Sequence, residues 1–222
     1  MKRLTSFLLV FALLLSMMPT AFAAGGAEDG TSAPDQIDST TVWRYLDDNT
    51  DPAGTPGSES YNRTSWTAVG FDDSAWKTAS GSFGAKNDGT SDGADHKLDG
   101  CNGSSNYPTY YFRTKVNVSD ANAVTKITGT IAFDDAVIVY INGEKAFSYN
   151  DTGADTNSSY CTNKSANKQT ESFEITDSAV LNNLVSGTNV IAVELHNQAA
   201  DSSDIWFTMP DMTFSTETLP TT

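Results

Sequence analysis

Apolar and polar residues alternate with a period of two through the middle of the chain. Residues two apart in a β-strand point to the same face of a sheet. The segment "TYYFRTKVNV", residues 109–118, therefore predicts a half-buried strand with one core face and one solvent face. The residues expected on its core face are Tyr110, Phe112, Thr114, Val116 and Val118.

Four further segments show strand patterns. "ITGTIAF", residues 127–133, alternates, while "AVIVYI", residues 136–141, is apolar at every position and predicts a central strand covered on both faces. "NVIAVELHN" and "DIWFTMPDMTF", residues 189–197 and 204–214, also alternate. In the last segment Ile205 and Phe207 point inward and Trp206 lies on the opposite face.

Helical periodicity is confined to "TDSAVLNNLVSG", residues 176–187. Thr176 or Asp177 could cap a short helix there, and Gly187 could end it. Several strands with turn-rich connections and one minor helix predict an all-β fold, a two-sheet β-sandwich with one short helix.

The segment "FDDAVIVYINGEKAF", residues 133–147, predicts a β-hairpin, because an Asn-Gly pair between strands is typical of a type I′ turn. Asp134 and Asp135 stand where the first strand begins. Short carboxylates in such a position commonly accept hydrogen bonds from nearby backbone N–H groups. The alternative is that the pair contributes ligands for Ca²⁺ or for sugar hydroxyls.

The N-terminus predicts export. Lys2 and Arg3 precede a short apolar run and then "AFA", residues 21–23, which is typical of a signal peptide over residues 1–23. Residues 24–40 are small and polar and predict a disordered leader. We expect the folded domain over residues 41–215 and the start of a Thr/Pro linker, to a further domain, over residues 216–222.

Charge narrows the range of partners. The chain has 28 acidic and 13 basic residues and a formal net charge of −15. Nucleic-acid binding requires clustered Lys and Arg, which this sequence lacks. No segment after the signal peptide approaches the roughly 20 apolar residues needed to cross a bilayer, so membrane insertion is not expected. We expect a secreted protein that is extracellular or on the cell surface.

Two long polar connections, residues 84–108 and 149–169, carry the only cysteines, Cys101 and Cys161. An even cysteine count in an exported protein favours one disulfide, with two free thiols as the alternative. Such a bond would hold the two connections together at one end of the sandwich.

The first long connection also has a composition that suits Ca²⁺, because Asp88, Asp92 and Asp95 alternate with glycines. Their spacing differs from that of an EF-hand loop, and a solvated acidic loop is the alternative. His196 lies two residues from Glu194 on one strand face, where the pair could share a hydrogen-bond network with Asp134 or Asp135. No HExxH, CxxC or phosphate-binding motif occurs.

The segments "FDDSAW", "YYFRTKVNV", "FDDAVIVYINGEKAF", "SGTNVIAVELHN" and "SSDIWFTM" together resemble the galactose-binding-like jelly-roll domains of secreted bacterial proteins. The resemblance covers residues 66–214. These domains are often found beside calcineurin-like metallophosphoesterases and are similar to the sugar-binding domain of β-galactosidases. The resemblance implies a jelly-roll sandwich that acts as a non-catalytic module.

A carbohydrate is the partner that the resemblance implies, and aromatic side chains are candidates to stack on it. Trp206 stands where the family pattern has a small or polar residue, although it could instead lie beneath a loop. Tyr107 and Tyr160 are the other candidates, beside the two cysteines. The alternatives are a structural spacer or docking domain ahead of a metallophosphoesterase or glycosidase, or a free-standing hydrolase with a carboxylate pair.

Overall fold

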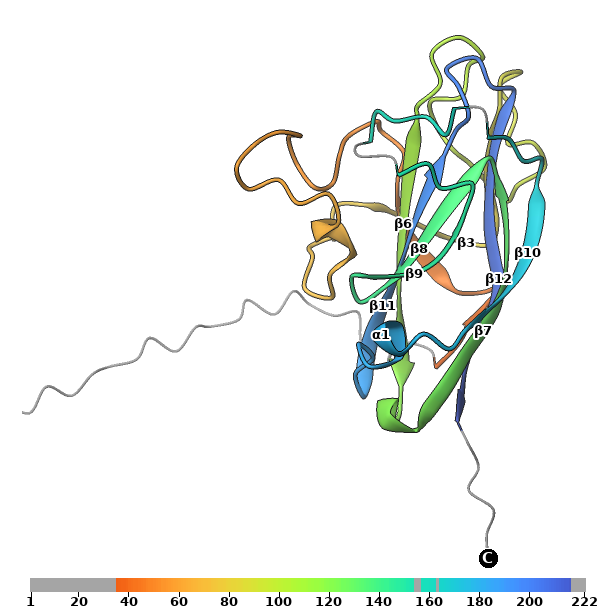
Figure 1. Ribbon diagram of the computed structural model, residues 1–222. Helices are drawn as coiled ribbons and strands as arrows, with labels where there is room; N and C mark the ends of the chain where they lie inside the picture. Colours follow the sequence, from red (N-terminus) through yellow and green to blue (C-terminus); the bar gives the residue numbers. More distant parts are fainter. Residues whose placement is uncertain (1–34, 154–156, 163, 217–222) are drawn as a thin grey trace, which may run out of the picture. The chain divides into compact units, whose positions relative to one another are not determined.

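Two β-sheets pack face to face in the computed structural model, which describes residues 35–153, 157–162 and 164–216 (Figure 1). In the first sheet the strand order is β10-β7-β12-β4-β5, and β1 also pairs with β12. Its strands are β1 (Ile37–Asp38), β4 (Phe83–Lys86), β5 (His96–Lys97), β7 (Val124–Asp134), β10 (Gln169–Ile175) and β12 (Asp204–Thr216).

In the second sheet the strand order is β3-β2-β6-β11-β8-β9. Its strands are β2 (Val42–Leu46), β3 (Lys77–Ser80), β6 (Thr109–Val118), β8 (Ala136–Ile141), β9 (Glu144–Tyr149) and β11 (Gly187–His196). All neighbouring strands are antiparallel except β4 and β5. This architecture confirms the predicted two-sheet β-sandwich with one short helix.

The inward faces of the two sheets form the main core. Phe112 of β6 and Phe207 of β12 are fully buried, and their ring centroids lie 4.4 Å apart. Ile191 and Val193 of β11 and Ile205 of β12 are also buried, as the alternation predicts. Burial of each such side chain contributes roughly 1.5–3 kcal/mol to folding.

A second hydrophobic cluster covers the outer face of the second sheet. Its members are Trp66, Trp76, Tyr111, Ile138, Tyr140, Val190 and Ala192. Trp66 belongs to a 3₁₀ turn, η1 (Ser65–Thr67), in the connection between β2 and β3. The two-sided burial predicted for β8 is therefore confirmed.

The prediction that β6 is half-buried holds at Lys115 and Asn117 and is wrong for the first part of the strand, where the connection between β2 and β3 covers the outer face. Tyr111 and Arg113, which were expected to face solvent, are 3% and 1% exposed. The Arg113 guanidinium Nε donates to an oxygen of Asp73 at 2.7 Å. Arg113 also donates to the carbonyls of Trp66 and Ala68, so its buried charge is well paired.

The predicted hairpin and helix are both present. Asn142 and Gly143 join β8 to β9 with positive φ angles of 50° and 95°, as a type I′ turn requires. Helix α1 spans Ser178–Leu181, and the Asp177 side chain caps it by accepting a hydrogen bond from the backbone N–H of Ala179 at 2.8 Å. A second 3₁₀ turn, η2 (Ala121–Ala123), precedes β7.

Three asparagines seal the end of the sandwich at the β8–β9 turn, which we call the closed end. The side-chain nitrogen of Asn142 donates to the Asn183 carbonyl and to Asn189 Oδ1, at 2.9 and 2.7 Å. Asn189, which is fully buried, also accepts from the N–H of Val185 and donates to the carbonyls of Val185 and Gly187. This network ties α1, the hairpin turn and the start of β11 together.

The folded domain begins earlier than the sequence suggests. Ile37 and Asp38, within the predicted disordered leader of residues 24–40, form β1 and pair with β12. Ile37 is 1% exposed, so one apolar side chain anchors an otherwise polar stretch. Strand β12 continues to Thr216, one residue beyond the predicted boundary. The predicted signal peptide and residues 217–222 of the predicted linker lie outside the described residues.

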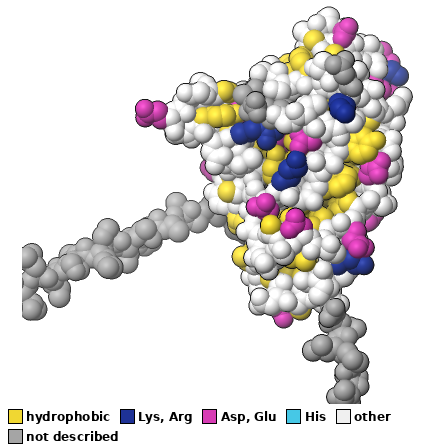
Figure 2. Space-filling model, in the orientation of Figure 1, with side chains coloured by type: hydrophobic (Ala, Val, Ile, Leu, Met, Phe, Trp, Pro, Cys, Tyr) yellow, Lys and Arg dark blue, Asp and Glu magenta, His cyan; other side chains and the backbone are white. Residues whose placement is uncertain are grey.

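On the face shown in Figure 2, hydrophobic side chains gather in a stripe at the side where the edge strands β9 and β10 lie in Figure 1. The half-buried Phe147 and Tyr149 of β9 border the core, and Phe147 contacts Phe173 of β10 with ring centroids 5.2 Å apart.

Within the described residues, no helix combines the length and apolarity needed to span a bilayer.

Candidate functional site at the loop end

Three connections meet at the end of the sandwich opposite the closed end. They are residues 100–108, 157–161 and 197–203, and we call this region the loop end. Asn106, which is 2% exposed, joins all three. Its side-chain oxygen accepts from the backbone N–H groups of Asn102 and Gly103, at 2.7 and 2.8 Å, and its side-chain nitrogen donates to the Ser202 carbonyl at 2.7 Å.

The backbone of Asn106 completes the junction. Its N–H donates to the Ala200 carbonyl at 2.9 Å, and its carbonyl accepts from the Tyr160 hydroxyl at 2.6 Å. A fully buried second asparagine, Asn197, ties the same connections nearer to the strands. It donates to the carbonyls of Pro108 and Tyr107 and accepts from the N–H of Cys161. The loop end is thus held by buried amide groups.

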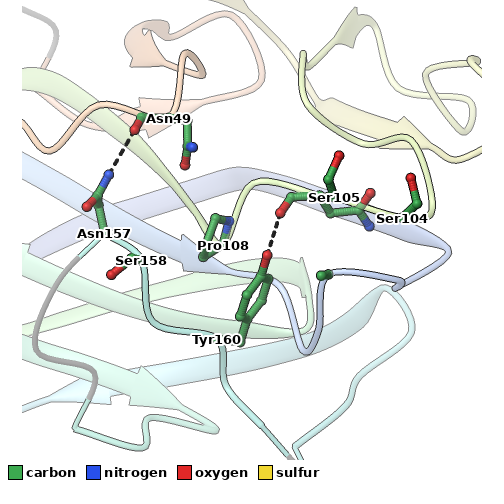
Figure 3. A pocket seen from close by; sticks show the side chains of 9 residues that line it. Asn49, Ser104, Ser105, Pro108, Asn157, Ser158 and Tyr160 are labelled. Atoms are coloured by element: carbon green, nitrogen blue, oxygen red, sulfur yellow. Dashed lines mark hydrogen bonds between the residues drawn. The ribbon is translucent and has the colours of Figure 1, made fainter.

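Between these connections lies an open cavity of about 560 Å³ (Figure 3). Its lining residues are Asn49, Ser104, Ser105, Asn106, Pro108, Asn157, Ser158, Tyr160 and Ala200. The Asn157 side chain donates to the Asn49 carbonyl at 2.9 Å, which brings the connection after β2 to the rim. The lining therefore combines amide and hydroxyl groups with one aromatic ring and one proline, and none of its described residues carries a charged side chain.

Of the three predicted aromatic contacts, only Tyr160 lines this cavity. Its hydroxyl donates to the backbone carbonyl of Asn106. Tyr107 packs against the core instead, and its ring lies over Gly100. Gly100 has a φ of 80°, and a Cβ at that position would lie only 2.1 Å from the Tyr107 ring, so glycine is required there.

Trp206 lies apart from the cavity, on the outer face of the first sheet. It is half-buried and stands opposite Gly84 of β4, whose missing side chain leaves room for the indole. The Lys168 ammonium lies 4.0 Å from the centre of the Trp206 ring and forms an ion pair with Asp92 at 2.8 Å. These contacts match the structural alternative for Trp206, because a protein cation already occupies one face of the ring.

Asp134 and Asp135 are both 2% exposed and serve backbone groups. Asp135 accepts hydrogen bonds from the N–H groups of Ala166 and Gln198, at 3.1 and 2.8 Å, and so holds two connections to the start of β8. Burial, together with the hydrogen bond and charge of Asp135, raises the pKa of Asp134 well above its usual range. These contacts agree with the structural interpretation of the pair and leave neither carboxylate open to a ligand.

His196 and Glu194 form the predicted pair, with His196 Nε2 and Glu194 Oε1 3.0 Å apart and both residues buried. The hydrogen bonds of this pair lead to Arg63 and Ser159, however, and not to the side chains of the aspartates. The Arg63 guanidinium donates to both Glu194 oxygens, at 2.9 and 3.0 Å. His196 Nδ1 faces the Ser159 carbonyl at 2.9 Å, so the ring supports the connection that carries Tyr160. Of the two aspartates, only Asp135 is bonded to His196: its backbone N–H donates to the His196 carbonyl.

The predicted calcium loop has its carboxylates engaged separately. Asp88 accepts from Thr90, Asp95 accepts from the N–H and hydroxyl of Ser82, and Asp92 pairs with Lys168. Among the described residues, no three His, Cys, Asp or Glu side chains are grouped in a way that could hold a metal ion.

The predicted disulfide is wrong, because both cysteines are free thiols. Cys161 contacts the carbonyls of Lys164 and His196, whereas Cys101 contacts the carbonyl of Ser203. The connection of residues 197–203 bonds to both cysteine-bearing connections, so hydrogen bonds supply the link expected of the disulfide. Burial raises the pKa of Cys101 to about 11 and that of Cys161 to about 12, so both are poor nucleophiles.

The asparagines and serines that build the site were not predicted from the sequence. Asn106 and Asn197 are buried hubs, while Asn49 and Asn157 are bonded to each other at the rim. Their only signal was a high content of Asn and Ser in the long connections, which equally describes a solvated loop. Of the residues that line the cavity, Tyr160 alone was predicted, because it is a large aromatic beside a cysteine.

No model of a known protein family and no curated protein matches this chain. Among solved structures, a β-glucuronidase of Bacteroides uniformis is similar over 78% of this chain and 18% of its own, with 14% identity and a TM-score of 0.42. A β-glycosidase from Bacteroides vulgatus is similar over 78% and 20%, with 15% identity and a TM-score of 0.38.

The Ruminococcus gnavus β-glucuronidase, in complex with uronic isofagomine, is similar over 73% of this chain and 21% of its own, with 13% identity and a TM-score of 0.41. The chain thus spans about a fifth of the length of these enzymes. A likeness at this level concerns the fold and carries no inference about activity.

Proposed function

We propose that this chain is a secreted, non-catalytic carbohydrate-binding module that binds its ligand in the loop-end cavity. The observation that carries the proposal is the lining of that cavity, which is polar and uncharged and includes an aromatic ring. A sugar presents hydroxyl groups that donate and accept hydrogen bonds, together with apolar C–H faces. Ser and Asn side chains can donate and accept in the same way, and Tyr160 and Pro108 offer apolar surface.

The anchored geometry of Tyr160 favours binding. Because its hydroxyl is bonded to the Asn106 carbonyl, the ring is already held in place before a ligand arrives. A group that is ordered in advance loses less conformational entropy on binding. The site is small and open, so we expect weak binding at a single module and useful affinity only when several modules act together.

The positions of the buried carboxylates favour a non-catalytic role. A glycosidase needs two carboxylates facing its sugar, roughly 5–9.5 Å apart. Among the described residues, no acidic side chain lines the cavity. The buried carboxylates at this end, Asp134, Asp135 and Glu194, are 2%, 2% and 1% exposed and are bonded to protein groups.

We further propose that the module is accessory to a catalytic domain in the same polypeptide, a metallophosphoesterase or a glycosidase. The Thr/Pro composition of residues 216–222 supports this, because such segments commonly link domains. A structural spacer or docking domain with no ligand is the alternative, and the binding experiment separates the two.

The test is isothermal titration of the purified protein against a panel of soluble polysaccharides, with and without Ca²⁺. We expect saturable heat from the native protein. The affinity should fall at least tenfold in Tyr160→Ala and in Asn157→Ala. Asn122→Ala is the matched control, because Asn122 is exposed on η2 at the other end of the sandwich.

Each contrary result has a definite meaning. Binding that survives Tyr160→Ala but is lost in Trp206→Ala would move the site to the outer face of the first sheet. Absence of heat with every polysaccharide, from a protein that unfolds cooperatively, would reject the carbohydrate-binding module and favour the spacer. A requirement for Ca²⁺ would support the predicted acidic loop of Asp88, Asp92 and Asp95.

A further inference from the structure

The described residues that line the loop-end cavity are uncharged, and two of them are followed or preceded in the sequence by an acidic residue. Asp48 precedes Asn49 of the lining, and Asp201 follows Ala200. In the sequence, no Lys, Arg or His lies within three positions of any lining residue. Adjacent Cα atoms are about 3.8 Å apart, so these carboxylates lie within about one Debye length of the cavity at physiological ionic strength.

Two cations near this end are committed to acidic partners. The Arg63 guanidinium donates to both oxygens of Glu194, at 2.9 and 3.0 Å. The Lys77 ammonium lies 2.8 Å from oxygens of both Asp47 and Asp99. Neither of these cations lines the cavity, and neither does the exposed Lys164, four positions after Tyr160. Among the described residues, no side chain in the lining therefore offers a positive charge to an anionic ligand.

Recognition of a carboxylate or sulfate normally uses Arg or Lys, because a charge-assisted hydrogen bond offsets the cost of removing the anion from water. Neutral hydroxyl groups carry no such cost and fit amide and hydroxyl partners. The formal net charge of the whole chain, −15, further disfavours an anionic ligand.

We propose that this cavity selects neutral sugars and discriminates against glycans that carry carboxylate or sulfate groups. The inference rests on the proposed function, because it specifies the ligand class of the same site. It identifies Asp48 and Asp201 as specificity-determining residues that act through their charge, without contact with the sugar.

The experiment compares matched polysaccharides that differ in charge. The probes are galactan with polygalacturonate, mannan with polymannuronate, and a soluble glucan with its C6-oxidised polyuronate, each titrated at low and at high salt. We expect the neutral member of at least one pair to bind about tenfold or more tightly than its acidic counterpart at low salt. The difference should shrink at high salt, because salt screens the repulsion.

A charge-reversal variant tests the named residues. Asp48→Lys combined with Asp201→Lys should raise the affinity for the polyuronate about fivefold at low salt while changing that for the neutral member less than twofold. The control is Glu144→Lys combined with Glu174→Lys. This control makes the same change in net charge at two exposed residues remote from the loop end, and it should alter neither affinity.

The outcomes separate the two proposals. A polyuronate that binds as tightly as its neutral counterpart, or more tightly, would overturn the selectivity and leave a carbohydrate-binding module. An equal gain in both charge-reversal variants would show that only net charge matters and would reject the role of Asp48 and Asp201. Failure of all six polysaccharides to bind a folded protein would reject the proposed function, and the selectivity with it.

Discussion

The two ends of this sandwich are both organised by a buried asparagine, yet one end is sealed and the other holds a cavity. At the closed end, Asn189 bonds to the backbone of Val185 and Gly187, a few residues away on the same connection, and to the side chain of Asn142. At the loop end, Asn106 joins three connections that are distant in sequence.

The lengths of the connections explain the difference. The closed end has a two-residue turn and a single-turn helix, so its polar groups lie close together and satisfy one another. The loop end has long connections that meet at Asn106 and leave space beside it. Their backbones bond at the hub, and space remains between Ser104, Ser105 and Asn157. A buried side-chain amide can therefore close one end of a fold or border a cavity. Which of the two it does depends on how far away in the sequence its hydrogen-bond partners lie.

The largest effect on stability is expected at the closed end. Asn189→Ala removes four side-chain hydrogen bonds at a fully buried position. We expect a loss of about 3 kcal/mol in the free energy of unfolding, measured by urea denaturation, with ligand binding unchanged in the folded protein. A loss below about 1 kcal/mol would show that the network adds little.

At the loop end, Asn106→Ala should reduce stability less than Asn189→Ala does, and it should reduce carbohydrate binding more. We expect a loss of about 2 kcal/mol, because Asn106→Ala removes three side-chain hydrogen bonds rather than four. Carbohydrate affinity should fall at least tenfold, since the wall that carries the Tyr160 anchor loosens. Equal effects of Asn106→Ala and Asn189→Ala on binding would remove the distinction between the two ends.

The acidic pair at the loop end predicts a pH dependence. The pKa of Asp134 is raised above that of an unfolded Asp, so the folded state binds more protons between the two values and stability falls as the pH rises through that interval. Asp134→Asn mimics the protonated form and removes this dependence. In denaturation experiments from pH 5 to pH 8, the free energy of unfolding of the variant should rise relative to that of the native protein. The rise should be at most about 1.4 kcal/mol per pH unit.

A constant stability difference over this pH range would contradict the raised pKa of Asp134. The remote Asp177 offers a comparison, because it caps α1 at the closed end. Asp177→Asn keeps a capping side chain and is the matched control for the Asp-to-Asn exchange.

The smallest effect concerns the cysteines. Because both thiols are free, a reducing agent should leave the melting temperature unchanged. A thiol reagent should titrate two groups per chain in denaturant without reductant, and react slowly with the native protein, since burial raises the pKa of both thiols. Finding no thiols in denaturant would restore the predicted disulfide between Cys101 and Cys161.

Local patterns in the sequence were enough to predict β6, β7, β8, β11 and β12, the Asn142-Gly143 hairpin and the cap of α1. Each depends on residues close together in the chain, through alternation, positive φ angles or a side chain that bonds two residues ahead. The face assignments of β6 and β12 hold, because residues two apart must share a face. The predicted exposure of the outer face of β6 fails at Arg113, which is covered by a connection that begins far away in the sequence.

The sequence by itself thus determined the sandwich and the acidic, polar character of its long connections, since both follow from local order and composition. The tertiary structure alone decided which connections meet, that residues 197–203 bond to both cysteine-bearing connections, and that Tyr160 rather than Trp206 lines the cavity. Asn106 lies 96 residues from Ser202 and 54 from Tyr160, and no local pattern encodes hydrogen bonds across such separations. They form only after the strands have brought the connections to one end of the fold.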